Sequence, residues 1–222
     1  MRRRDFIRKT GVAVAAPLFI PRHVLGRGFT APSDKIVMGC IGVGGMGSGH
    51  VRSFLGQDDV HIVAICDVRR EHLDRAVGMV NAAYGNSQCA GYHDFRDILA
   101  RNDIDAIVTA TPDHWHALIG LEAARRDIDM YYEKPLSRTI AESRAIRDAV
   151  KNSGVVFQFG TQQRSDQRFR FALELIRNGR IGELQQVMIG SASYNQIPLQ
   201  KEQPVPPGFD YNMWLGPAPW AP

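Results

Sequence analysis

Residues 35–67 read KIVMGCIGVGGMGSGHVRSFLGQDDVHIVAICD, and the expected fold follows mainly from them. An apolar run, Lys35–Ile41, leads into the glycine loop Gly42–Gly47, and a helical segment over Gly45–Leu55 follows. A second apolar run, Val60–Asp67, ends on an acid. A G-x-G-x-x-G loop between a strand and a helix, with an acid about 20 residues further on, is the pattern of a dinucleotide-binding βαβ unit.

Each glycine of the loop has a chemical reason. Gly42 permits the tight turn, Gly44 lets the backbone approach a pyrophosphate, and Gly47 lets helix and strand pack closely. The pyrophosphate is expected at the N-terminus of the helix, where free N–H groups and the helix dipole favour an anion. Gly45 and Met46 complete the loop and are predicted cofactor contacts as well.

The acid after the second strand bears on which cofactor binds. Asp67 follows Gly47 by twenty residues and is placed to accept hydrogen bonds from the adenosine ribose hydroxyls. A carboxylate there would repel a 2′-phosphate, which favours NAD. Arg69 and Arg70 point the other way, because a neighbouring arginine accommodates the 2′-phosphate of NADP. The prediction is NAD, with NADP left open.

Strands and helices continue to alternate after this unit. Further strands are predicted at Ile104–Thr109, Asp129–Glu133 and Val155–Phe159, and helices at Arg69–Tyr84, His114–Arg126 and Ile140–Ser153. Buried runs separated by amphipathic helices imply a parallel sheet that is covered on both faces. The fold class predicted for residues 34–160 is therefore α/β, a Rossmann-type doubly wound parallel sheet.

The pattern changes after Gly160. A helix is expected over Gln167–Asn178 and a longer, half-polar strand over Gly182–Tyr194, and the remaining residues are proline-rich and irregular. A lone strand needs a partner for its backbone groups. We expect residues 161–222 to begin an α+β open-sheet second domain that this chain does not complete, or whose missing strands a partner supplies.

The residues ahead of the fold form a basic leader. Arg3 and Arg4 precede an apolar run, Gly11–Ile20, which is shorter than the ~20 residues that span a bilayer. This layout is that of a secretory signal, and the paired arginines resemble a twin-arginine signal, which exports folded proteins. We expect residues 1–33 to be signal and linker and the protein to be periplasmic, or held at the membrane if the signal stays uncleaved. The alternative is a disordered basic terminus.

Composition excludes several classes of protein. Much of the formal net charge of +4 lies in the leader, so no nucleic-acid partner is expected. Three cysteines, an odd number without metal-type spacing, argue against a disulfide framework and a metal site. Cys40 and Cys66 lie in apolar runs, where a free cysteine packs as a small buried hydrophobe.

Two further loops follow predicted strands, at the edge where open α/β sheets bind ligands. The first is Thr111–His116, TPDHWH. Thr111 or Asp113 is suited to cap the next helix, but a cap does not explain two histidines and a tryptophan at the rim of a cofactor cleft. His114 and His116 lack the spacing of helical metal ligands, so no metal is expected.

The second loop is Glu133-Lys134-Pro135. Pro135 biases Lys134 toward an extended conformation, which aims its ammonium beyond the sheet edge; whether the bond between them is cis stays open. A lysine beside a bound nicotinamide would polarise a substrate hydroxyl or carbonyl. Without the glycine loop, the alternative of a surface Glu-Lys pair would be preferred.

The ordered set of these motifs resembles the glucose–fructose oxidoreductase / inositol dehydrogenase / MocA (Gfo/Idh/MocA) family. The likeness runs from about Asp34 to Val187, and Glu133-Lys134-Pro135 is its most specific element. The resemblance implies an NAD(P)-dependent oxidoreductase acting on a sugar or cyclitol, and a homo-oligomer formed through the second domain. The arginine-rich leader is similar to that of the exported, sugar-acting branch.

The resemblance also implies roles for single residues. Lys134 is the catalytic lysine near the nicotinamide and the substrate hydroxyl. The cofactor contacts are Gly42, Gly44, Gly45, Met46, Gly47, Asp67, Arg69, Thr111, Pro112, His116, Glu133 and Lys134, and the candidate substrate contacts are Trp115, Gln162 and Arg164. The family's acid–base Asp and His lie in its second domain, and no residue from 165 to 222 takes their place.

Two other functions remain open. Some relatives oxidise a sugar carbon transiently, eliminate a glycosidic substituent and reduce the carbon back, which gives net hydrolysis with catalytic NAD. A non-catalytic nucleotide-binding relative is the third reading, and the presence of Gly44, Asp67 and Lys134 counts against it.

Overall fold

The computed structural model describes residues 30–190, 198 and 201–220. Nearly all of the predicted leader lies outside the described residues. Within the described part, no helix is both long enough and apolar enough to cross a membrane.

Six parallel strands form a sheet in the order β3-β2-β1-β4-β5-β6. They are β1 (Ile36–Ile41), β2 (Val60–Cys66), β3 (Ala90–Tyr92), β4 (Ala106–Thr109), β5 (Asp129–Glu133) and β6 (Phe157–Gly160). The chain builds outward from β1 to β3, then crosses to the other side of β1 and builds outward again. This is the Rossmann order, with its switch point between β1 and β4, and it confirms the predicted fold class.

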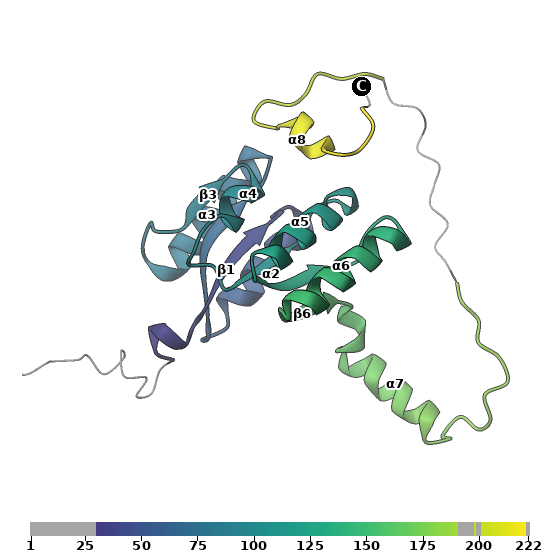
Figure 1. The fold of residues 1–222 in the computed structure, drawn as a ribbon. Coiled ribbons are helices and arrows are strands. Elements are labelled where there is room, and N and C mark those ends of the chain that lie inside the picture. Colours follow the sequence, from purple (N-terminus) through teal and green to yellow (C-terminus); the bar gives the residue numbers. More distant parts are fainter. Residues whose placement is uncertain (1–29, 191–197, 199–200, 221–222) are drawn as a thin grey trace, which may run out of the picture.

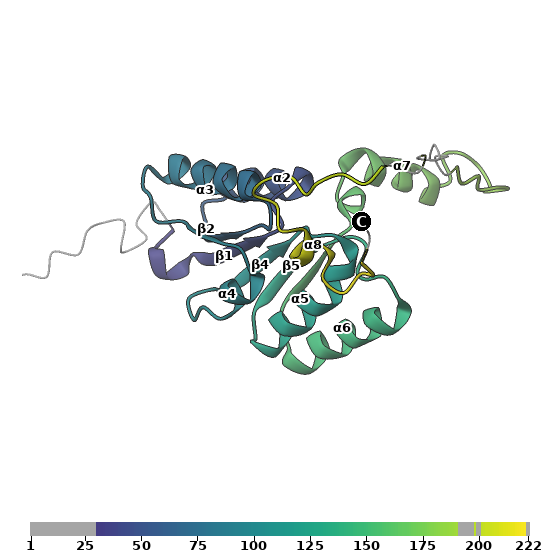
Figure 2. The same cartoon turned by 90° about the horizontal axis from the view of Figure 1, so that it is seen from above.

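Helices cover both faces of the sheet (Figure 2). On one face lie α2 (Gly45–Leu55) and α3 (Arg70–Tyr84), and on the other lie α4 (Phe95–Leu99), α5 (Asp113–Arg125) and α6 (Ile140–Ser153). Each layer buries its own apolar cluster against the strands, one around Val51, Ile65 and Val80 and the other around Ile107 and Ile119. The continuous apolar runs of the strands are thus explained by burial on both faces.

The predicted helices and strands of the sheet domain are confirmed with small shifts at their ends, but two elements were missed. β3 has only three residues and contains Gly91, so it carries no apolar run. α4 is a single short turn whose N-cap is Asp94, which accepts a hydrogen bond from the Arg96 N–H. Elements this short bury too few residues to give a periodic signal.

The prediction that Cys40 and Cys66 are free and buried is confirmed, and Cys89, for which no burial was predicted, is free and buried as well. Burial raises the pKa of the Cys40 and Cys66 thiols, and it raises that of Cys89 to about 11. These thiols therefore stay protonated at neutral pH and pack as apolar groups.

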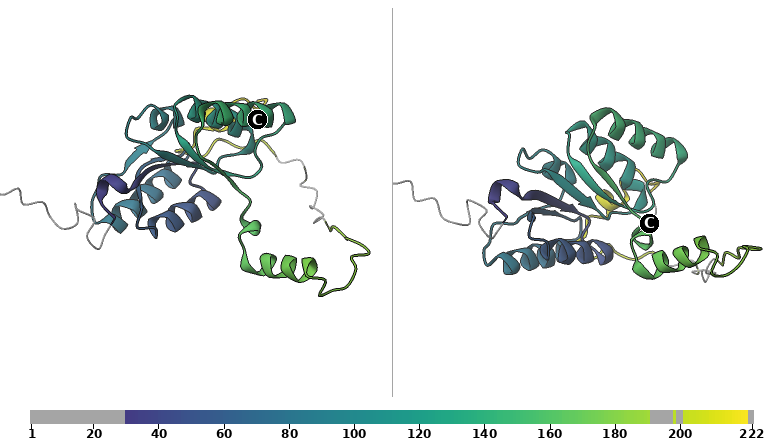
Figure 3. Two further views of the ribbon diagram at one scale, coloured as in Figure 1. Left: turned by 60° about the horizontal axis from the view of Figure 1, so that its bottom comes forward. Right: turned by 90° about the horizontal axis from the view of Figure 1, so that it is seen from below.

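The chain leaves the sheet after β6. η2 (Gln162–Arg164) leads to α7 (Gln167–Arg177), which extends away from the sheet (Figures 1 and 3). The strand expected over Gly182–Tyr194 is wrong for its described part, because residues 182–190 carry no strand and are exposed. No described strand lies beside them, so their backbone groups have no ladder to join.

The chain then returns to the carboxyl edge of the sheet (Figure 1). Residues 211–215 were expected to be irregular but form α8 (Tyr211–Leu215), whose N-cap Asp210 accepts a hydrogen bond from the Met213 N–H at 2.8 Å. Leu215 is buried, and Met213 packs against the cluster around Ile107. The assignment of residues 161–222 to a second domain stays a prediction.

Candidate functional site

The glycine loop joins β1 to α2 so closely that two of its glycines admit no side chain. Gly42 has φ +77°, and a Cβ there would lie 2.9 Å from the backbone of Ala110. A Cβ on Gly47 would lie 1.8 Å from the Gly42 carbonyl oxygen. The first turn of α2 is therefore brought directly against the end of β1, which points its free N–H groups at the sheet edge.

Asp67 ties the end of β2 to this loop. Its carboxylate is buried and accepts hydrogen bonds from the backbone N–H groups of Val43 and Arg69, each at 2.8 Å. The His72 Nδ1 atom lies 3.6 Å from the same carboxylate. A carboxylate oxygen accepts more than one hydrogen bond, so Asp67 can hold the loop and a ribose hydroxyl together.

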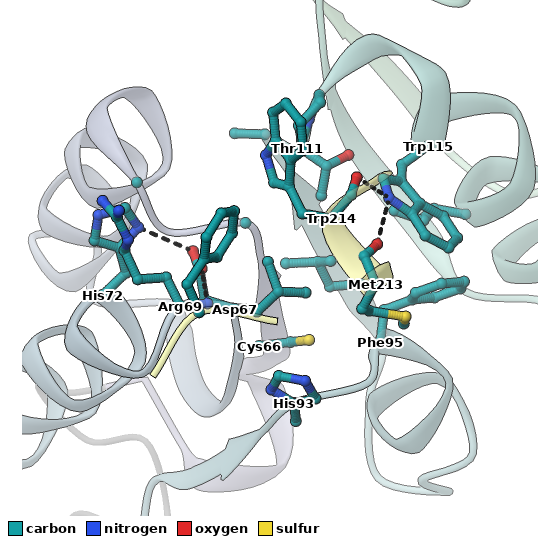
Figure 4. A pocket seen from close by; sticks show the side chains of 18 residues that line it. Cys66, Asp67, Arg69, His72, His93, Phe95, Thr111, Trp115, Met213 and Trp214 are labelled. Carbon is teal, nitrogen blue, oxygen red and sulfur yellow. Dashed lines mark hydrogen bonds and ion pairs between the residues drawn. The ribbon is translucent and has the colours of Figure 1, made fainter. Parts of the chain in front are cut away.

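A cavity of about 430 Å³ opens where β1, β2 and β4 end (Figure 4). Of the residues predicted from sequence to bind a ligand, its lining includes Gly42, Gly44, Asp67, Arg69, Thr111, Pro112 and Trp115. The Thr111 hydroxyl oxygen is buried there and has no hydrogen-bond partner among the described residues. A glycine cradle, a buried acid and an unpaired hydroxyl at one cavity fit a dinucleotide.

The two arginines that favoured NADP have partners. Arg70 Nε donates to Asp74 Oδ2 at 2.9 Å, one turn along α3. The Arg69 guanidinium lies 5.2 Å from the centre of the Phe209 ring, a cation–π distance. Asp67 is thus a carboxylate held by backbone N–H groups at the cavity, and a carboxylate at this position favours NAD over NADP.

A buried carboxylate stands at the end of β5. Glu133 is 4% exposed, and its Oε1 lies 2.8 Å from Nε2 of His50, which comes from α2. Its Oε2 accepts a hydrogen bond from the Lys134 N–H at 3.1 Å. Glu133 thereby fixes the backbone of the next residue instead of lining the cavity.

Lys134 is exposed and follows β5, the strand beside β4. The Lys134–Pro135 bond is cis, which settles the point that the sequence left open. Neither Glu133 nor Lys134 lines the cavity around Asp67. Their roles at the nicotinamide end of the cofactor stay predictions.

His116 joins the two loops. It is 1% exposed, and its ring nitrogens lie 2.5 Å from the Pro135 carbonyl oxygen and 3.0 Å from that of Thr111. The buried Tyr132 hydroxyl donates to the His116 carbonyl oxygen. The structure therefore places His116 behind the cavity wall, where it holds the Thr111 and Pro135 loops side by side.

The remaining predicted residues lie in different places. Gly45 and Met46 are exposed in the first turn of α2, and Gln162 and Arg164 are exposed in η2. Trp115, proposed as a substrate contact, is buried, and its indole N–H donates to the carbonyl oxygens of Met213 and Trp214 at 3.1 Å each. Sequence reasoning missed His50, Phe209, Met213 and Trp214, none of which belongs to a recognised motif.

Among the residues that the structure describes, no group of three or more His, Cys, Asp or Glu side chains is arranged to hold a metal ion.

Loss of His50 is expected to destabilise the fold. A His50→Ala variant leaves Oε1 of the buried Glu133 carboxylate without its histidine partner, which we expect to cost about 2–3 kcal/mol of unfolding free energy. Arg52→Ala, an exposed position on the same helix, is the control and is expected to change stability by about 0.5 kcal/mol or less. Urea denaturation measures both, and equal stabilities for the two variants would contradict the pairing.

Known proteins are similar to this chain in sequence. Residues 36–161 match the family model described as an oxidoreductase family with an NAD-binding Rossmann fold. A glycosyl hydrolase family 109 protein of Shewanella woodyi is 32% identical over 75% of this chain and 36% of its own length. The uncharacterized oxidoreductase YrbE of Bacillus subtilis is 31% identical over 81% of this chain and 48% of its own length. The chain thus spans less than half the length of either relative.

Two solved structures resemble the fold. The myo-inositol 2-dehydrogenase of Lactobacillus plantarum is 26% identical with a TM-score of 0.61, over 67% of this chain and 43% of that one. The WlbA dehydrogenase of Bordetella pertussis, solved with NADH and UDP-GlcNAcA, is 28% identical with a TM-score of 0.58, over 67% of this chain and 41% of that one.

Proposed function

The chain belongs to the Gfo/Idh/MocA family of NAD-binding oxidoreductases, and from this membership we propose that the whole protein transfers a hydride between the nicotinamide and a hydroxyl-bearing carbon of a sugar or cyclitol. The observation that carries the proposal is the position of Lys134. It follows the strand beside β4, and its N–H donates to Glu133. The ring of His116 lies between the carbonyl oxygens of the next residue, Pro135, and of Thr111 in the loop that lines the cavity. Dehydrogenases of inositol and of a nucleotide-linked sugar share the fold, which supports this substrate class.

In the proposed reaction, the glycine loop, Asp67 and Lys134 have different roles. The nicotinamide supplies the hydride acceptor, and the protein supplies orientation and charge. The glycine loop and Asp67 hold the pyrophosphate and ribose, which fixes the position of the ring. The Lys134 ammonium donates a hydrogen bond to the reacting oxygen and stabilises the negative charge that develops there as its proton leaves. The proton goes to an acid–base pair that we assign to the second domain.

A substrate panel tests the proposal. The full-length protein is incubated with NAD and a set of sugars and cyclitols, and formation of reduced nicotinamide is followed by its absorbance. Reduction that depends on a carbohydrate hydroxyl supports the proposal. No reduction and no chemical change in any member of the panel would refute it.

A second candidate is favoured by the curated relatives. Several of them carry the name glycosyl hydrolase family 109 protein, and an oxidation–elimination–reduction cycle uses the same NAD site. Mass balance separates the two: a dehydrogenase consumes one NAD for each product molecule, whereas the hydrolase releases sugar with NAD unchanged. Product analysis by mass spectrometry, with NAD present well below substrate, distinguishes them.

Three further assignments complete the proposal. We propose periplasmic export by the arginine-rich leader, a second domain that begins near residue 161, and assembly of copies through that domain. Export is tested by fractionating cells that express the full-length protein, and by replacing Arg3 and Arg4 with lysine, which is expected to retain the protein inside.

A further inference from the structure

Residues 208–216, called the strap here, cross the carboxyl edge of the sheet. At one end the strap is bonded to the loop after β2. The Arg70 N–H donates to the Gly208 carbonyl oxygen at 2.8 Å, and the Asp210 N–H donates to that of Val68 at 3.0 Å. The Asp210 carboxylate also lies 2.9 Å from His93 Nε2. Its hydrogen bonds to the Met213 N–H and to His93 hold the pKa of Asp210 below its usual value.

At the other end the strap is bonded to the first turn of α5, the helix that follows β4. The Trp115 indole N–H donates to the carbonyl oxygens of Met213 and Trp214, and His114 Nε2 lies 2.7 Å from the latter oxygen. A Cβ at Gly216 would lie 2.2 Å from the Trp115 ring, so the backbone passes directly over the indole. The strap therefore spans the switch point of the sheet and is fixed on both sides.

The strap forms part of the wall of the cavity described above. Phe209, Met213 and Trp214 line it together with Asp67 and the glycine loop (Figure 4). The glycine loop takes the pyrophosphate and Asp67 takes the adenosine ribose, so the adenine ring must lie on the far side of Asp67. Apolar side chains also line the cavity, and among them are Val68, Phe95 and Ile119.

We propose that the strap completes the adenine slot, with Phe209 and Trp214 as adenine-binding residues, and that it must detach before the cofactor leaves. Aromatic rings bind any base through its π face, and an adenine between them loses contact with water on both sides. The assignment deepens the proposed function by adding residues to its cofactor site, and it rests only on NAD binding. A protein that binds NAD without turnover would leave it intact.

The opposite role is also chemically possible for these side chains. A strap that fills the slot in place of adenine would compete with the cofactor, and its removal would then tighten binding. The two roles predict changes of opposite sign, so one set of variants decides between them.

The test uses the full-length protein and two variants, one in the strap itself and one at Trp115, which anchors it. Both are called strap variants here. Phe209→Ala removes one ring, and Trp115→Phe keeps an aromatic ring but removes the N–H that holds α8. Trp220→Ala is the control, because Trp220 is an exposed aromatic residue (72%) beyond the strap. NADH is bound to each protein and then displaced with excess NAD in a stopped-flow instrument, and the loss of enhanced NADH fluorescence gives the dissociation rate.

Both strap variants are expected to release NADH about tenfold faster or more, with little change in association, and the control is expected to match the parent. Reduced nicotinamide mononucleotide, which lacks the adenosine, is the second probe and is expected to bind parent and variants equally. Unchanged or slower release of NADH, or tighter binding, would overturn the proposal. An equal loss for the mononucleotide would also overturn it, since it would reflect general damage to the site.

Discussion

A Lys134→Ala variant of the full-length protein is expected to lose turnover by about 10²–10⁴-fold, with almost no change in NAD affinity. Removal of the ammonium takes away the hydrogen bond that stabilises the charge developing on the reacting oxygen. The glycine loop, Asp67 and the strap, to which we assign cofactor binding, are untouched. Steady-state kinetics with the substrate found in the panel, together with NADH titration, measure the two effects separately.

The matched control is Lys151→Ala, which removes an exposed lysine from the last turn of α6. Its turnover is expected to equal that of the parent protein. A Lys134→Arg variant tests whether charge alone suffices, because the guanidinium keeps the charge but has a different shape and donor geometry. Turnover retained in Lys134→Ala would remove Lys134 from the mechanism.

Gly47→Ala is expected to abolish NAD binding and to destabilise the fold by about 3 kcal/mol or more. The new methyl group would lie 1.8 Å from the Gly42 carbonyl oxygen, which is backbone and has no rotamer with which to move aside. Either α2 shifts away from β1 or the turn at Gly42 opens, and both displace the N–H groups that meet the pyrophosphate. Thermal unfolding and NADH titration measure the two losses.

The matched control is a second glycine-to-alanine substitution in the same helix, α2. Gly49 also lies in α2, and nothing stands within 4 Å of a Cβ placed there. Gly49→Ala is expected to stabilise the protein by about 0.5–1 kcal/mol, since glycine is the poorer residue in a helix interior, and to leave NAD binding unchanged. Similar behaviour of the two variants would contradict the account of the glycine loop.

Local patterns were enough to predict most of the sheet domain. The strands Ile36–Ile41 and Ala106–Thr109 are buried along most of their length, so each appears in the sequence as a nearly continuous apolar run. Tight packing of α2 on β1 requires glycines at a fixed spacing, and that spacing can be recognised in the sequence. The strand expected over Gly182–Tyr194 shows the limit, because a run of suitable residues forms a strand only beside a partner.

The candidate site was predicted only where its residues belong to motifs. Arg69 meets Phe209 and Trp115 meets Trp214 across 140 and 99 residues, and no local pattern encodes a contact of that range. The pairing of His50 with Glu133 across 83 residues is of the same kind. His116 was predicted as a cofactor contact because it follows Thr111 and Pro112 in the loop after β4. The direction in which its ring points depends on the neighbouring Pro135 loop, to whose carbonyl oxygen the ring is bonded.

The main proposal is that the carboxyl edge of the sheet binds NAD and that Asp67 makes the site prefer NAD to NADP. Direct titration tests both statements. Full-length protein, freed of any bound nucleotide, is titrated with NADH and NADPH by calorimetry, alongside an Asp67→Ala variant. We expect one NADH bound for each chain, at least about tenfold more tightly than NADPH. In the variant that preference is expected to shrink, because the carboxylate that holds the ribose and repels a 2′-phosphate is gone. Tighter binding of NADPH by the parent protein, or no binding of either nucleotide, would contradict the account.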